Sequence, residues 1–174
     1  MKTITTKVQV WSAVAGLFLT PFALTAAPLN LSVFKGNYTG TMSYTQPGDP
    51  AQNSTATVVI GVPQSGKTAR INYRANIGGN AFPTVISLAA NKRASVTDLL
   101  VGIAGTNNAK PGTGPWSQNQ RTLRFTATNG EGISLRGTGV VKDFSNRREL
   151  NLTLISTDPG GSYRFEARLR SRLP

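Results

Sequence analysis

The chain has 174 residues, with 19 Lys and Arg against 7 Asp and Glu, and it contains no Cys and no His. Its length predicts one domain. The absence of Cys and His excludes disulfides, thiolate nucleophiles, Cys/His metal sites and catalysis by a histidine base. We therefore expect a protein that is not an enzyme and has no catalytic residues, no metal site and no cofactor. The formal net charge of +12 favours an anionic partner.

Residues 1–27 have the pattern of a secretory signal peptide, in which a basic start is followed by an apolar stretch and then by small residues. Cleavage is expected after Ala26 or Ala27, which leaves a domain over 28–174. An uncleaved membrane anchor is the alternative, but the apolar stretch is shorter than the ~20 residues that a membrane helix needs. The sequence therefore predicts export to the periplasm or the outside of the cell.

Beyond residue 28, apolar and polar residues alternate in short runs, which is typical of half-buried β-strands. In 163–170, for example, aromatic and aliphatic residues share one parity while Arg and Glu occupy the other. We expect strands over 34–45, 55–61, 70–75, 84–90, 96–104, 122–127, 132–142, 149–154 and 163–170. This pattern predicts an all-β domain, either a single antiparallel up-and-down barrel or a sandwich, with about 8–9 strands. A short helix within 89–100 is an alternative reading of that segment.

One long loop is expected over 105–119, because this segment is polar and rich in Gly and Pro. The loop contains Trp116, either as a lid over the barrel interior or as an aromatic anchor on the rim. A barrel of this size can enclose one small ligand. Tyr73, Phe125 and Trp116 are therefore candidate pocket residues for a small hydrophobic molecule.

Residues Gly61–Thr68 match the phosphate-loop pattern G-x-x-x-x-G-K-[ST] letter for letter. Such a loop binds phosphate at the N-terminus of the helix that follows it. Here the next residues alternate like a strand, so the segment is predicted to be the turn of a hairpin. We expect no nucleotide as a partner.

Basic residues gather on the outward parity of the C-terminal strands. The candidate anion-binding face consists of Arg124, Arg136, Arg147, Arg148, Arg164, Arg168, Arg170 and Arg172. Adjacent strands place such side chains roughly 4.8 Å apart, so a meander would form a broad positive face. This face is expected to bind an anionic polymer or a membrane surface. The alternative is a solvated face that keeps the protein dispersed.

Residues 33–41 resemble the first strand of lipocalin-like barrels, which carries a Gly-x-Trp signature. In this sequence Gly36-Asn37-Tyr38 has Tyr in place of Trp. The likeness spans a short part of the chain and assigns no family. The favoured function is thus a non-catalytic binding or surface-interaction module that uses its basic face, and the alternative is a lipocalin-like carrier of a small hydrophobic ligand.

Overall fold

The computed structural model describes residues 29–101 and 109–172, with the backbone alone described at 172. The expected signal peptide lies outside the described residues. Among the described residues, no helix is long and apolar enough to cross a membrane.

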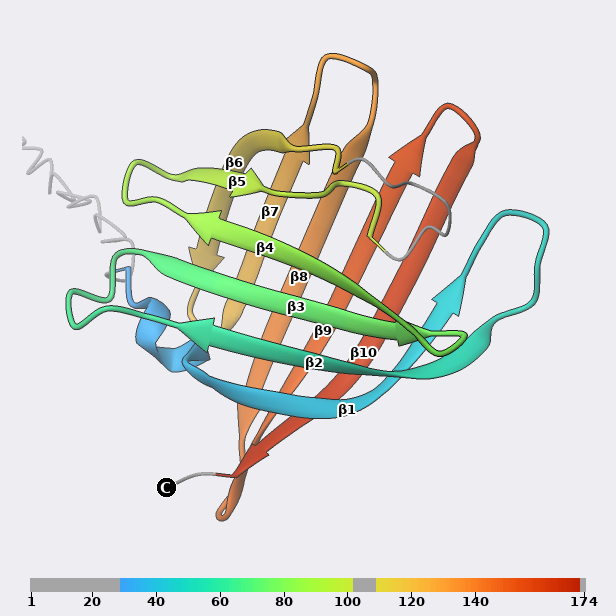
Figure 1. Cartoon of the computed structure of the whole chain (residues 1–174). Coiled ribbons are helices and arrows are strands. Elements are labelled where there is room, and N and C mark those ends of the chain that lie inside the picture. Colours follow the sequence, from blue (N-terminus) through green and yellow to red (C-terminus); the bar gives the residue numbers. More distant parts are fainter. Residues whose placement is uncertain (1–28, 102–108, 173–174) are drawn as a thin grey trace, which may run out of the picture.

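Ten antiparallel strands, each paired with its neighbours in chain order, close into one barrel (Figure 1). Closure comes from β1 and β10, where Met42 lies opposite Ala167. The strands are β1 (Gly36–Thr45), β2 (Gln52–Gly61), β3 (Ala69–Ile77), β4 (Asn80–Leu88), β5 (Arg93–Val96), β6 (Gly112–Asn119), β7 (Thr122–Thr128), β8 (Ser134–Asp143), β9 (Arg147–Asp158) and β10 (Gly161–Arg172). The predicted all-β up-and-down barrel is confirmed, with ten strands instead of the expected 8–9.

The sequence did not reveal β6, which occupies much of the predicted long loop, and it misplaced β5. The Gly and Pro residues of β6 hid it, but each fits the local geometry. A Cβ at Gly114 would overlap the carbonyl oxygen of Thr126 on β7, so only glycine allows this close approach. Pro115 lies where the β6–β7 pairing is interrupted, so its missing N–H breaks no bond of that ladder.

The expectations for 89–104 were partly wrong. The strand predicted over 96–104 is not formed as such, because β5 ends at Val96 and residues 97–101 are not in a strand. The short-helix alternative within 89–100 is also wrong, since Arg93–Val96 pairs on both sides within the barrel. By contrast, the hairpin predicted at Gly61–Thr68 is confirmed: β2 ends at Gly61, and a strand rather than a helix begins at Ala69.

One end of the barrel, here called the η1 end, is closed by the 3-10 helix η1 (Leu31–Phe34). Leu31 and Phe34 are buried, and the Asn30 side chain accepts a hydrogen bond from the backbone N–H of Ser32. The N–H of Leu31 donates to the carbonyl of Gly66 at 2.9 Å, which ties η1 to the β2–β3 turn. At the other end, Leu99, Leu100 and Val101 are buried against the barrel.

Apolar and aromatic side chains fill the described interior between the two ends. Tyr38, Met42, Tyr73 and Phe165 are among the largest fully buried ones. The Tyr73 hydroxyl donates to the Met42 sulfur at 3.0 Å. A central void lined by Phe34 and nine other residues measures only about 10 Å³, which is room for no more than about one water molecule.

Candidate anion-binding surface

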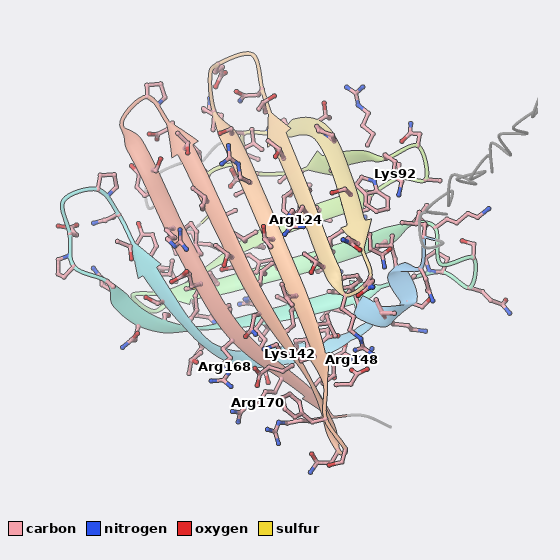
Figure 2. The ribbon with its side chains drawn as sticks, turned by 180° about the vertical axis from the view of Figure 1, so that it is seen from behind. Lys92, Arg124, Lys142, Arg148, Arg168 and Arg170 are labelled. Carbon is pink, nitrogen blue, oxygen red and sulfur yellow. The ribbon has the colours of Figure 1, made fainter. Side chains whose placement is uncertain are left out.

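Most of the basic residues predicted to share a face lie on outward positions of β7 to β10, where they form two groups. The prediction is wrong for Arg148, which has the same parity on β9 as the buried Leu150 and Leu152 and therefore lies on the inward side. Arg124, Arg136 and Arg164 lie toward the middle and far end of this wall, and uncharged residues separate them along each register row. A denser group lies nearer the η1 end (Figure 2). We name it the Glu149 cluster; it comprises Lys142 on β8, Arg147 and Glu149 on β9, and Arg168 and Arg170 on β10.

Strand register explains why the Glu149 cluster forms. Glu149 lies directly opposite Lys142 on one side and Arg170 on the other. Directly opposed residues have Cβ atoms about 4.5–5.5 Å apart, so their side chains meet. Arg147 and Arg168 occupy the outward positions next to this row, so four cations from three strands surround one carboxylate.

The Glu149 carboxylate is held by arginine Nε atoms. Arg168 Nε donates to Glu149 Oε1 at 3.0 Å, and Arg170 Nε lies 3.7 Å from Oε2. The Glu149 side chain is 3% exposed although it points outward, because guanidinium groups cover it. The hydrogen bond from Arg168 is the largest influence on Glu149 and holds its pKa below the ordinary value of 4.5.

The two arginines remain open to solvent beyond this contact. The Arg168 and Arg170 side chains are 65% and 59% exposed. Each faces Glu149 through Nε, so within the described part of the chain its terminal Nη atoms can donate to a further acceptor. A guanidinium can donate two parallel hydrogen bonds to one oxyanion, and here Glu149 orients two such groups on the surface.

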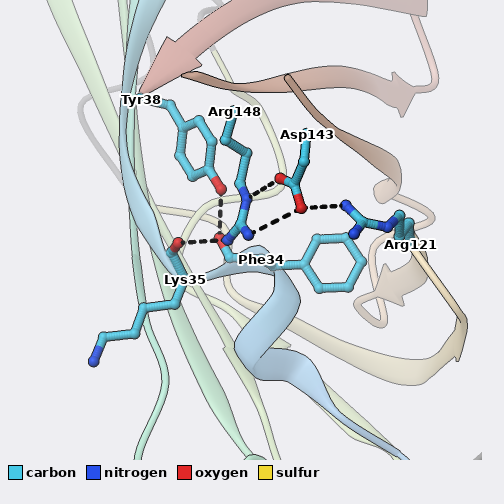
Figure 3. Close-up of polar contacts among 6 residues, drawn as sticks. All are labelled: Phe34, Lys35, Tyr38, Arg121, Asp143 and Arg148. Carbon is cyan, nitrogen blue, oxygen red and sulfur yellow. Dashed lines mark hydrogen bonds and ion pairs between the residues drawn. The ribbon is translucent and has the colours of Figure 1, made fainter. Parts of the chain in front are cut away.

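Arg148 belongs to a different arrangement, at the η1 end (Figure 3). Its Nε and Nη2 donate to the two oxygens of Asp143 at 2.5 and 3.3 Å, and its Nη1 donates to the carbonyl of Lys35 at 3.4 Å. Arg121 Nη1 reaches the same carboxylate at 2.7 Å. The hydrogen bond from Arg148 is the largest influence that lowers the pKa of Asp143. These contacts join η1 to the β8–β9 turn, so Arg148 serves the closure of the barrel.

The other predicted basic residues differ in their surroundings. Arg164 is paired with Glu166 at 2.6 Å, so part of its charge is neutralised. The Arg147 guanidinium lies over the Phe144 ring at 4.5 Å. Of Arg172 the structure describes the backbone, which pairs with Arg147.

The three candidate pocket residues do not form one pocket in which Trp116 covers Tyr73 and Phe125. Trp116 is in β6 rather than in a loop, is 3% exposed, and donates from Nε1 to the carbonyl of Ala89 at 2.9 Å. It thus anchors the β4–β5 turn, and Lys92 of that turn lies 4.4 Å over its ring. Phe125 pairs with Trp116 and lines the small central void, whereas Tyr73 lies elsewhere in the barrel wall.

Among the described residues, no group of three or more His, Cys, Asp or Glu side chains is placed to hold a metal ion. The sequence matches no family model and no curated protein.

Glu149 is the residue of this surface that sequence reasoning missed. Its parity correctly indicates an outward position, which normally means a solvated carboxylate. The signal that would have revealed its burial is the alignment of Glu149 with Lys142 and Arg170, and this alignment depends on strand register.

Proposed function

We propose that the protein is a non-catalytic binding module that attaches to polyanions through the Glu149 cluster. The observation that carries this proposal is the convergence of four cationic side chains from three adjacent strands on a single acid. The cluster has a net charge of +3, and Glu149 is the only acid among its members. A positive surface of this density attracts anionic polymers or head groups at a distance and binds them by releasing their counterions.

Heparin, a sulfated polysaccharide, and duplex DNA are suitable probes for this proposal. Wild-type protein should bind both, and the logarithm of the binding constant should fall linearly with the logarithm of the salt concentration. The triple variant Lys142→Gln/Arg168→Gln/Arg170→Gln should lose most of this binding and most of the salt dependence.

The matched control is Arg124→Gln/Arg136→Gln/Arg164→Gln, which removes the same number of positive charges from the same wall. It should retain most of the affinity, because its residues lie outside the Glu149 cluster. Thermal melts of both variants check that the barrel is intact. If both variants lose affinity equally, binding reflects the total charge of the molecule and the proposed site is wrong.

Glu149→Gln tests whether the cluster is an organised site. If only diffuse charge mattered, removing a negative charge would strengthen the binding of heparin. If Glu149 orients Arg168 and Arg170, the variant should bind heparin about tenfold more weakly, the effect of losing about one charge-assisted hydrogen bond. The two possibilities differ in the sign of the change, so one titration separates them.

The carrier hypothesis draws no support from the barrel interior, where the central void measures about 10 Å³. Ligand pockets are usually about 300–1,000 Å³ in volume. This contrast favours the outer surface over the interior as the place of binding.

A further inference from the structure

A depression lies on the wall formed by β2 to β6, away from the Glu149 cluster. It has a volume of about 720 Å³, within the range of small-molecule sites. It opens beside the β2–β3 and β4–β5 turns, which project next to each other from the barrel (Figure 1). We call this depression the β3–β5 groove.

Strand register defines the floor of the β3–β5 groove. Arg70 on β3 lies opposite Ser87 on β4, which lies opposite Ser95 on β5, and Ser95 lies opposite Thr113 on β6. All four are groove residues. Because the side chains of Ser87 and Ser95 are short, the surface is depressed at these two residues relative to the longer side chains around them. The low floor presents hydroxyl groups that can donate or accept hydrogen bonds.

The charge of the groove has one sign. Arg70 and Arg93 both line it, and none of its lining residues is acidic. Arg93 comes two residues before Ser95 on β5, so the two guanidinium groups approach the serine floor from different strands. Arg93 Nη2 donates to the Thr113 hydroxyl at 3.1 Å, and no carboxylate pairs with either arginine among the described residues.

The rim of the groove is apolar and anchored. Val62 and Pro63 line it from the β2–β3 turn, and Ala89 lines it from the β4–β5 turn. The first turn is fixed by the hydrogen bond between Leu31 and Gly66, and the second by the bond from Trp116 to Ala89. A site whose walls are already fixed loses little free energy to ordering when a ligand binds.

We propose that the β3–β5 groove binds a small organic anion that has an apolar body. The acidic group would accept hydrogen bonds from Arg70 and Arg93, with Ser87 and Ser95 beneath it, and the apolar body would lie against Val62, Pro63 and Ala89. Charge complementarity selects this ligand class, because two unpaired arginines and an apolar rim favour an amphipathic anion over a neutral or cationic molecule. The turn that matched the phosphate-loop pattern supplies part of the rim, whereas arginine side chains supply the anion contacts.

The probe for the test is 8-anilinonaphthalene-1-sulfonate, which joins a sulfonate to an aromatic body. Fluorescence titration of the folded protein should show saturable binding to one site. Arg70→Gln/Arg93→Gln should weaken it by roughly tenfold or more, as expected for the loss of charge-assisted hydrogen bonds. Ser95→Phe, which fills the floor without changing the charge, should weaken it as well.

Two controls make the outcome decisive. Arg124→Gln/Arg136→Gln removes equal charge from β7 and β8, outside both the groove and the Glu149 cluster, and should leave binding of the probe unchanged. N-phenyl-1-naphthylamine, which lacks the sulfonate, should bind at least tenfold more weakly. The proposal is overturned if the Arg70/Arg93 variant binds like wild type, if the neutral dye binds equally well, or if the folded wild type shows no saturable binding. None of these results bears on heparin binding by the Glu149 cluster.

Discussion

Gly137 and Gly139 lie two residues apart on the inward face of β8, yet their surroundings differ. A Cβ at Gly137 would overlap the ring of Phe125, whereas a Cβ at Gly139 would lie 3.5 Å from Leu150 Cδ1, an ordinary contact. The ring of Phe125 therefore uses the space that Gly137 leaves open. The sequence shows two similar glycines, and only the packing distinguishes them.

Gly137→Ala should destabilise the barrel by about 1–3 kcal/mol, because the added methyl group forces Phe125 out of its position in a close-packed core. Gly139→Ala should change the free energy of unfolding by less than about 0.5 kcal/mol. Chemical denaturation of both variants measures the difference. Equal stabilities would show that the Phe125 ring is not packed over Gly137.

Glu149 shows the limit of prediction at a single residue. Alternation correctly places it, Arg168 and Arg170 on the outward side of the barrel. Alternation does not tell which outward residues are neighbours, because that depends on the register between strands, which brings together residues as far apart in the chain as Glu149 and Arg168, 19 positions from each other. The Glu149 carboxylate is buried beneath two arginines because of the register in which β9 pairs with β10.

The contact between η1 and the rest of the barrel depends on a polar network that contains a titratable carboxylate, that of Asp143. Arg148 connects the Asp143 carboxylate to the carbonyl of Lys35, which directly follows η1. Tyr38 at the start of β1 donates from its hydroxyl to the carbonyl of Phe34 at 2.9 Å. Burial raises the pKa of Tyr38, so the tyrosine stays neutral and the acid–base behaviour of this end is determined by Asp143.

The lowered pKa of Asp143 predicts a loss of stability in acid. A carboxyl group whose pKa is lower in the folded state stabilises the fold above its ordinary value of 3.8 and loses this contribution as the pH falls through the lowered pKa. Asp143→Asn lacks the contribution at every pH, so its free energy of unfolding should fall less steeply than that of wild type below about pH 4. Arg148→Gln, which removes the main cause of the shift, should flatten the curve in the same way. Urea denaturation at a series of pH values measures these slopes, and parallel curves for all three proteins would contradict the prediction.

The elements themselves were predictable to different degrees. Strands with a clear alternation, such as β3 and β10, were located from sequence, and so was the hairpin at Gly61–Thr68. β6 could not be located from the sequence, because its Gly and Pro residues are typical of loops. It is a strand because it pairs with β5 and β7. Gly114 is needed for close approach to β7, and Pro115 is tolerated at an interrupted stretch of the ladder.

For the whole molecule, the decisive property is that η1 covers one end of the barrel, that Leu99, Leu100 and Val101 are buried at the other, and that side chains fill the described interior. Phe34 of η1 lines the central void, which measures about 10 Å³. The described residues around this void therefore form a packed core, and the β3–β5 groove, at about 720 Å³, lies outside it.

Phe34→Ala tests this view of the interior. Removing the ring should cost about 3–5 kcal/mol of stability and leave a dry apolar cavity that takes up a small molecule such as benzene. Wild type should show no benzene-induced shifts in the NMR spectrum, and Val59→Ala, at an outward side chain that is 44% exposed, should show none either. Uptake of benzene by wild type would instead favour the carrier hypothesis.

The sequence by itself determined the strand class, the turn at Gly61–Thr68 and the outward parity of most arginines of the C-terminal strands, because alternation and turn chemistry are local properties of a chain. Only the tertiary structure decided that the sheet closes, that Lys142, Arg168 and Arg170 meet at Glu149 while Arg148 serves η1, and that Arg70 and Arg93 border one groove. The physical reason is that a period of two specifies the side of the sheet on which a residue lies. Its neighbours on that side follow from register and closure, which involve the whole barrel at once.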